Sequence, residues 1–157
     1  MECRRRREVR KFVTVRDFAR KTPMEYIVQL PSRATERSMG YDFYANDNYV
    51  VHPNEVVKVW TDVKAYMGED EGLILNIRSS MGGKWALINQ QGWVDSDYVD
   101  NESNDGNIGF FLKNTTDKIQ MISRGERIGQ GMFVKYLVTD DDEPINKSRK
   151  GGFGSTN

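Results

Sequence analysis

Apolar residues occur along this 157-residue chain in short clusters separated by Gly, Asn, Asp and Pro, and no segment keeps an apolar pattern at helical spacing. Such clusters are typical of β-strands. The pattern predicts strands over residues 11–15, 26–30, 41–45, 49–51, 55–61, 63–67, 72–77, 86–89, 92–94, 107–112, 118–122 and 128–138. Only residues 79–84 leave room for a short helical turn. We therefore predict an all-β sandwich or barrel-like roll with Greek-key connections.

The apolar pattern stops near Thr139, and the remaining residues are polar and end in a glycine-rich stretch. We predict a β-roll domain over residues 1–143 and a flexible C-terminal arm over residues 144–157. An arm that leaves its own domain is free to dock on a neighbouring subunit. This organisation points to an oligomer.

The length of 157 residues and the content of 38% hydrophobic residues are those of one globular domain. Such a domain can form a core without a stabilising metal or disulfide. Cys3 is the only cysteine, so an internal disulfide is excluded and a reducing compartment is expected. No apolar run reaches the roughly 18 residues of a membrane span, and the N-terminus lacks the apolar stretch of a secretion signal. We expect a cytoplasmic protein without membrane contact.

The net charge is zero, although arginines gather at residues 4–7 and acidic residues at 140–143. Stable nucleic-acid binding is not expected, because proteins that follow phosphates normally carry a broad positive surface. His52 is the only histidine, which excludes a metal site with several histidines. Nothing near His52 suggests that it is the base of a catalytic triad.

Two short segments carry groups suited to phosphate. Arg78, Ser79 and Ser80 follow an apolar strand directly, so that a planar cation and two hydroxyls lie at a strand end. A polar turn is the alternative reading. The amide of Gln130 follows residues 127–129 and is of low specificity alone.

Residues 92–98 place two carboxylates and a tyrosine at the end of an apolar strand. One carboxylate could hold or deprotonate a water, and Tyr98 could pack against a sugar. An acidic turn with Tyr98 in the core is the alternative.

Asp42 lies inside an aromatic strand, and its carboxylate needs partners if it is buried. These partners could be an arginine or a backbone amide, or the waters of a phosphate-bound Mg²⁺.

The end of the chain, residues 149–157, combines glycines, one aromatic ring, hydroxyls and cations. Glycines let successive backbone N–H groups turn toward one anion, and hydroxyls add donors. Arg149 would supply a charged fork, and Phe153 could cover a flat ring. A frayed terminus is the alternative.

Taken in order, these segments resemble the five motifs of the trimeric dUTP diphosphatase (dUTPase) family. They are residues 40–45 with 61–63, 78–80, 92–98, 127–130 and 151–156. The resemblance extends from Pro31 to the last residue. It implies a jelly-roll-like β fold and a homotrimer whose C-terminal arms close over active sites made between subunits.

The resemblance also implies the role of each residue. Asp95 would orient and activate the attacking water, and Tyr98 would lie under the deoxyribose and exclude ribonucleotides. Gly92 and Gly109 would belong to the hairpin whose backbone reads the uracil edge. The residues implied at the phosphates and in the closing arm are Arg78, Ser79, Ser80, Gln130, Arg149, Phe153, Gly154, Ser155 and Thr156.

The implied reaction is Mg²⁺-dependent hydrolysis of dUTP to dUMP and pyrophosphate, with water attacking the α-phosphorus. It would lower dUTP and supply dUMP for thymidylate synthesis. The substrate phosphates would bind most of the Mg²⁺, and Asp42 would hold it through water. Phe153 would stack on uracil while the arm clamps the phosphates. Catalysis would consist of aligning the water and neutralising phosphate charge.

The sequence departs from the family pattern in three places. Ser80 stands where a glycine is usual, and residues 99–105 lengthen the loop after Tyr98. Arg149 is one residue closer to the arm's phenylalanine than usual, which leaves open whether Arg149, Lys150 or Lys147 contacts the phosphates.

Two other functions are alternatives. A dCTP deaminase of the same fold family would place a carboxylate base on the strand after the hairpin, but Phe111 stands there and residues 107–112 contain no Asp or Glu. A regulatory, protein-binding module would keep the fold without catalysis. A protein partner acting through residues 99–105 or the basic N-terminal segment is left open.

Overall fold

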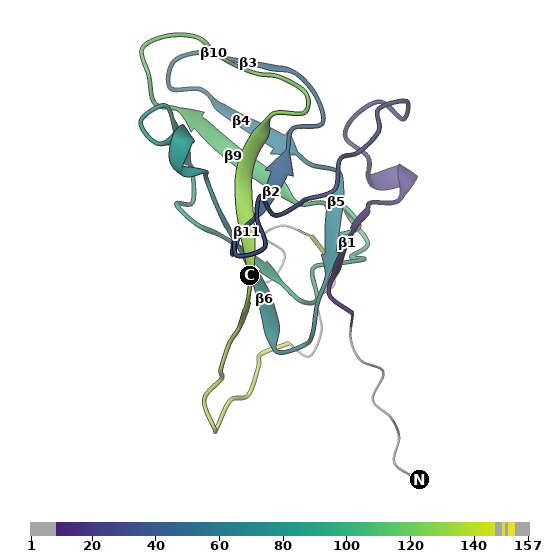
Figure 1. The fold of residues 1–157 in the computed structure, drawn as a ribbon. Helices are drawn as coiled ribbons and strands as arrows, with labels where there is room; N and C mark the ends of the chain where they lie inside the picture. The colour runs from purple at the N-terminus through teal and green to yellow at the C-terminus, as the bar shows by residue number, and fades with distance from the viewer. Residues whose placement is uncertain (1–8, 147–148, 150, 153–157) are drawn as a thin grey trace.

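The computed structural model describes residues 9–146, 149 and 151–152. Within that part of the chain the helical elements are two 3₁₀ turns, η1 (Asp17–Ala19) and η2 (Ser79–Met81), and everything else regular is β-strand (Figure 1). The all-β prediction and the helical turn after residue 78 are confirmed. None of the described residues forms a helix with the length and hydrophobicity that crossing a membrane requires.

Most strands belong to two antiparallel sheets. The larger sheet has the order β2 (Tyr41–Tyr44), β11 (Arg127–Lys135), β6 (Glu71–Asn76), β8 (Gly92–Asp95). The smaller has the order β4 (Val56–Trp60), β9 (Gly109–Asn114), β7 (Trp85–Leu87). Because sheet neighbours are far apart in the chain, the connections cross between sheets, as expected of a jelly-roll-like fold.

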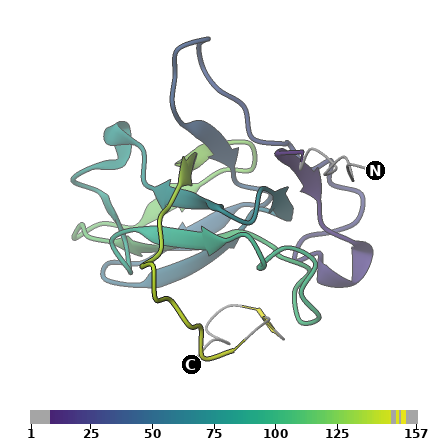
Figure 2. The ribbon, with the colours of Figure 1, turned by 90° about the horizontal axis from the view of Figure 1, so that it is seen from below.

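Two further antiparallel pairs complete the fold. β1 (Lys11–Thr14) pairs with β5 (Val63–Tyr66), and β10 (Gln120–Ile122) pairs with β3 (Tyr49–Val51). Figure 2 shows the segment after β11 leaving the strands and turning back toward the body. Residues 136–146 form no strand, so β11 ends at Lys135 and not at Val138 as predicted.

The core joins the two large sheets. Along β6 the side chains alternate, so that Leu73 and Leu75 are buried while Asn76 faces outward. The Phe43 ring of β2 lies 5.3 Å from the Phe110 ring of β9, centroid to centroid. A β-carbon at Gly129 would come within 2.2 Å of the Phe110 ring, so β11 can cross this ring only with glycine there.

The predicted strand at residues 26–30 is wrong. Ile27 is 93% exposed, and of the apolar residues in this segment Val28 packs against the core. The backbone groups of this segment bond locally: the Tyr26 N–H donates to the Pro23 carbonyl, and the Arg20 guanidinium donates to the Tyr26 carbonyl. Ile27 and Leu30 face solvent, whereas Val28 packs against the core without joining a sheet.

Candidate active site

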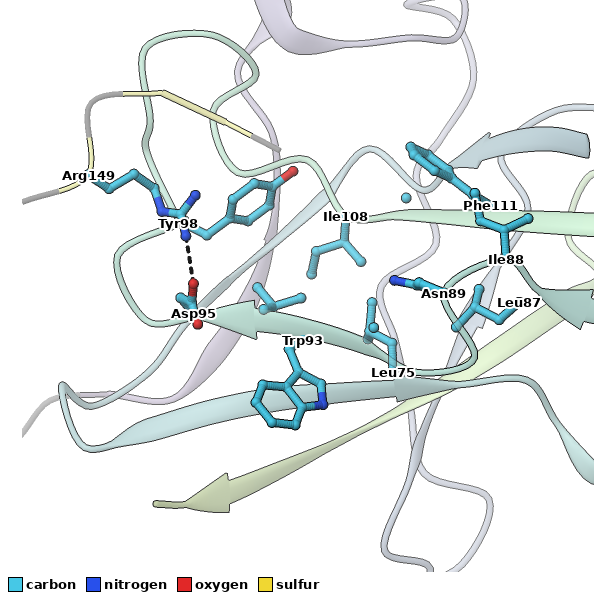
Figure 3. A pocket seen from close by; sticks show the side chains of 13 residues that line it. Leu75, Leu87, Ile88, Asn89, Trp93, Asp95, Tyr98, Ile108, Phe111 and Arg149 are labelled. Carbon is cyan, nitrogen blue, oxygen red and sulfur yellow. Dashed lines mark hydrogen bonds and ion pairs between the residues drawn. The ribbon is translucent and has the colours of Figure 1, made fainter. Parts of the chain in front are cut away.

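A pocket of about 220 Å³ opens between the start of β9 and the edge strand β8 (Figure 3). Its walls are mostly apolar, with one amide, one carboxylate and one guanidinium at the margin. The lining residues are Leu75, Leu87, Ile88, Asn89, Gly92, Trp93, Val94, Asp95, Tyr98, Ile108, Gly109, Phe111 and Arg149. An apolar pocket with a few convergent polar groups is the usual form of a small-molecule site.

The alternation of β8 determines which of its side chains reach solvent. Val94 is buried in the core, whereas Trp93 and Asp95 are exposed. Arg149 lies against the Asp95 side chain, and its Nη2 donates to the carboxylate at 2.6 Å (Figure 3). The Arg149 Nε also donates to Asp97 at 3.0 Å. The predicted arm cation is therefore paired with both carboxylates of the 92–98 segment, within the same chain.

Tyr98 is 7% exposed, and its ring still forms part of the pocket wall. Its hydroxyl donates to the Asn107 carbonyl at 2.6 Å and accepts a hydrogen bond from Asn104 Nδ2 at 2.8 Å. Burial raises the pKa of the Tyr98 hydroxyl, against the opposing effects of Asn104 and Arg149. Two hydrogen bonds therefore fix the hydroxyl oxygen of Tyr98, and the hydroxyl stays protonated.

The two predicted hairpin glycines both line the pocket, and each is close to a bulky side chain. A β-carbon at Gly109 would come within 2.8 Å of the Trp60 ring, and one at Gly92 within 3.1 Å of the Leu75 side chain. Larger residues would push these walls apart. The glycines therefore keep the backbone of both strands close to the pocket.

The predicted phosphate residues gather elsewhere, across three strands of the large sheet. Gln130 of β11 stands opposite Asp42 of β2 on one side and Asn76 of β6 on the other. Arg78 Nε lies 3.6 Å from Asp42 Oδ1, and Arg127 Nη1 lies 3.4 Å from Asp42 Oδ2. Ser79 and Ser80 follow in η2 and are exposed.

The cluster of Asp42, Arg78, Arg127 and Gln130, here called the Arg78 cluster, lies far from Asp95 within one chain. Asp95 stands opposite Gly72 near the beginning of β6, whereas Arg78 follows its end. Six residues of extended chain span roughly 20 Å. The structure therefore brings Asp95, Tyr98, Gly92, Gly109 and Arg149 together, and separately brings together Asp42, Arg78 and Gln130.

Some pocket residues were missed by reasoning from the sequence. Asn89 points into the pocket between apolar walls, and Phe111 closes one side (Figure 3). Asn89 lies in a turn after β7 and carries no local signal that separates it from other turn asparagines. The predicted residues Phe153, Gly154, Ser155 and Thr156 lie outside the described part of the chain.

Potential metal ligands are sparse. Among the described residues no group of three or more His, Cys, Asp or Glu side chains is placed to hold a metal ion. Asp42 offers oxygen ligands, which Mg²⁺ prefers, but its carboxylate already faces two arginines. Among the described residues, Asp42 offers oxygen atoms to a cation, but no cage of protein ligands surrounds it.

Fold and pocket place the chain among all-β proteins with a small ligand-sized cavity beside an exposed carboxylate. A family model described as dUTPase matches residues 27–157. The deoxyuridine 5'-triphosphate nucleotidohydrolase of Lactococcus lactis is 42% identical over 132 residues, which cover 82% of this chain and 88% of that protein. The chain belongs to the dUTPase family.

Solved structures agree with this assignment. The dUTPase of Streptococcus mutans superposes with a TM-score of 0.72 at 35% identity, over 82% of this chain and 98% of that chain. A D95N mutant dUTPase of phage phi11 of S. aureus, described with a coordinated structural Mg(II) ion, has a TM-score of 0.65 at 19% identity, over 88% of this chain and 98% of that chain. The second likeness concerns the fold alone.

Proposed function

We propose that this chain is a dUTP diphosphatase, which hydrolyses dUTP to dUMP and pyrophosphate. The observation that carries the proposal is the small apolar pocket with Asp95 and Tyr98 at its margin, in a member of the dUTPase family. The reaction would remove dUTP and supply dUMP for thymidylate synthesis. We place the activity in the cytoplasm.

The pocket suits a pyrimidine nucleoside. Gly92 and Gly109 bring backbone N–H and carbonyl groups to its walls, so that they can pair with the uracil edge. A base with the wrong donor and acceptor pattern would leave these groups unpaired, which is costly in a buried site. The Tyr98 ring, held by two hydrogen bonds, forms the surface for deoxyribose.

The exposed carboxylate of Asp95 acts on the attacking water. It accepts a hydrogen bond from that water and orients it toward the α-phosphorus, from which pyrophosphate leaves. The carboxylate must first release Arg149, which holds it at 2.6 Å. Arg149 is then available to the phosphates, together with the arm residues Phe153, Gly154, Ser155 and Thr156.

Arg78, Ser79, Ser80 and Gln130 would contact the phosphate chain. Arg78 and Arg127 already share the carboxylate of Asp42, so this end of the sheet carries excess positive charge. Mg²⁺ bound mainly by the phosphates would neutralise their charge. Asp42 would accept hydrogen bonds from its waters, because direct coordination would compete with both arginines.

The active sites would form between subunits of a homotrimer. The chain from Gly72, opposite Asp95, to Arg78 spans roughly 20 Å, and this separation favours a site shared between subunits. Domain 1–143 of one subunit would then be closed by arm 144–157 of another, and Arg149 would leave Asp95 of its own chain when the arm closes.

Deaminase activity is not supported. β9, the strand after the pocket hairpin, reads Gly-Phe-Phe-Leu-Lys-Asn and has no carboxylate to act as base. Phe111 of this strand lines the pocket instead.

A substrate panel tests the proposed function. The protein is incubated with Mg²⁺ and dUTP, dCTP, dTTP or UTP, and pyrophosphate and ammonia are assayed together. We expect pyrophosphate from dUTP and no ammonia from any nucleotide. Ammonia from dCTP, or no pyrophosphate from dUTP, would contradict the proposal.

A further inference from the structure

The loop over residues 99–106 has no role in the site described above. Its sequence is polar, as is typical of a solvent-exposed loop. Three of its side chains are nevertheless buried: Asn101 is 7% exposed, Asn104 is 9% and Asp105 is 0%. Burying polar groups is costly unless each finds a hydrogen-bond partner. The buried polar side chains of this loop therefore need hydrogen-bond partners that a solvent-exposed loop would not need.

Hydrogen bonds inside the loop fix its shape. Asn101 Oδ1 accepts hydrogen bonds from the backbone N–H groups of Ser103 and Asn104 and from the Ser103 hydroxyl. Asn101 Nδ2 donates to the Tyr98 carbonyl and to Asn104 Oδ1, each at 2.7 Å. Asn104 Oδ1 also accepts from the Gly106 N–H. The two asparagines thus brace each other.

The far end of the loop is anchored to distant parts of the chain. Asp105 accepts a hydrogen bond from the Arg16 backbone N–H at 2.7 Å and pairs with the Arg16 guanidinium. Lys64 of β5 donates to Asp105 at 2.9 Å and to Asp100 at 2.6 Å. These contacts tie the loop to a strand and to the N-terminal segment, which leaves it little freedom to shift.

The braced loop touches the candidate site at two adjacent residues. Asn104 Nδ2 donates to the Tyr98 hydroxyl at 2.8 Å. Ser103 Oγ accepts a hydrogen bond from the Gly152 N–H at 2.8 Å. A β-carbon at Gly152 would lie 2.5 Å from Ser103 Oγ and 3.1 Å from Asn104, so the arm is packed directly on these two side chains.

We propose that Asn104 is a positioning residue that sets how strictly the Tyr98 ring discriminates deoxyribose from ribose. The proposal rests on the proposed function. Because the Tyr98 hydroxyl accepts from Asn104 and donates to Asn107, its oxygen is fixed from two directions. A ring fixed in this way cannot tilt to admit an added 2′-hydroxyl. With the amide donor removed, the ring gains that freedom.

The variant Asn104→Asp tests this with little change in shape. Aspartate keeps an acceptor for Asn101 and for the Gly106 N–H, but its carboxylate and the Asn107 carbonyl would compete for the single hydroxyl proton of Tyr98, so that one of the two hydrogen bonds to this oxygen is lost. We expect the ratio of kcat/KM for dUTP to kcat/KM for UTP to fall by about tenfold, the size that the loss of one hydrogen bond produces. Glu102→Gln, at an exposed position in the same loop, is the matched control and should keep the ratio.

A double-mutant cycle separates positioning from a general effect on the fold. Tyr98→Phe removes the hydroxyl and should lower the ratio by itself, and adding Asn104→Asp should lower it little further. If Asn104→Asp lowers the ratio equally with and without the Tyr98→Phe change, the proposal is overturned. An unchanged ratio in Asn104→Asp alone would overturn it as well.

Melting temperatures monitor folding of each variant. If Asn104→Asp does not fold, the Tyr98→Phe variant still tests the proposal. An unchanged ratio of kcat/KM for dUTP to kcat/KM for UTP in Tyr98→Phe would contradict it. Failure of the proposed function is distinguishable, since it would appear as wild-type protein that releases no pyrophosphate from dUTP.

Discussion

Arg149 and Asp95 form an ion pair in which the guanidinium Nη2 lies 2.6 Å from the carboxylate oxygen. The Arg149 side chain is 7% exposed, whereas the Asp95 side chain is 63% exposed. The arginine is therefore held in the pocket while one side of the carboxylate remains open to water. In the proposed reaction these two groups must separate, because Arg149 binds the phosphates and Asp95 binds the attacking water.

Asp95→Asn should abolish pyrophosphate release while nucleotide binding remains. The amide cannot take a proton from the attacking water, and loss of a general base typically costs about 10²–10⁴-fold in rate. Steady-state turnover and calorimetric binding of a non-hydrolysable dUTP analogue measure the two effects. Asp97→Asn, which also loses a contact to Arg149, is the matched control and should retain most turnover. Wild-type turnover in Asp95→Asn would refute the assignment.

Deleting residues 149–157 should leave the oligomer intact and reduce turnover strongly, because closure over the nucleotide is lost while every strand that the structure describes is kept. Gly152→Ala is a milder test, since its methyl group would strike the Ser103 hydroxyl at 2.5 Å. We expect Gly152→Ala to raise KM for dUTP. Light scattering and turnover are measured on both. A truncated chain that loses its assembly would instead give the arm a structural role.

Asp62→Asn should lower the free energy of unfolding by about 2–4 kcal/mol, because it removes the charge from a fully buried carboxylate. Asp62 accepts hydrogen bonds from the Arg20 guanidinium and the Thr22 hydroxyl, and from Asn107 Nδ2 at 2.8 Å. Asparagine tolerates the left-handed φ of 57° at this position, so backbone strain is not added. Urea unfolding measures the change. Asp117→Asn, at an exposed position, should stay within about 0.5 kcal/mol.

Stability should fall as the pH drops below about 4, in part through Asp105. Burial raises the pKa of Asp105, but hydrogen bonds from Arg16 and Lys64 outweigh it and hold that pKa below its ordinary value. A carboxyl whose folded pKa is depressed contributes stability above its unfolded pKa, and this is lost as the pH falls through the folded pKa. Asp105→Asn should therefore be less stable than wild type at pH 7.

The difference between Asp105→Asn and wild type should begin to shrink below about pH 4, where Asp105 is protonated in the unfolded protein, and should be smallest once the pH is below the lowered pKa of the folded protein. Urea unfolding from pH 3 to pH 7 measures it. A difference that stays constant over this range would show that the charge of Asp105 contributes nothing.

The strands were largely predictable from the sequence, because short apolar clusters bounded by polar or turn residues, such as Leu73, Ile74 and Leu75 in β6, are typical of buried strands. The segment at 26–30 was not, because the apolar Ile27 faces solvent and the chain is held by Arg20. Family membership was recognised from five ordered motifs and is confirmed by the family model.

The candidate site was predictable only in part. Asp95, Tyr98 and Gly92 come from one segment, and a strand followed by a turn keeps them together. The loop after Tyr98 reads as solvated because its partners Arg16 and Lys64 lie far along the chain, and no local pattern records such pairs. The distance between Asp95 and Arg78 depends on how β6 and β8 are paired, which motif order alone does not specify.

The placement of the two groups of predicted residues at opposite ends of β6 has a genetic consequence. In a homotrimer, one complete site would draw Asp95 from one subunit and Arg78 from another. Two inactive chains, one lacking Asp95 and the other lacking Arg78, would then restore working sites when they assemble together, because each supplies the half that the other has lost. Alleles that are dead alone would complement each other within a single oligomer.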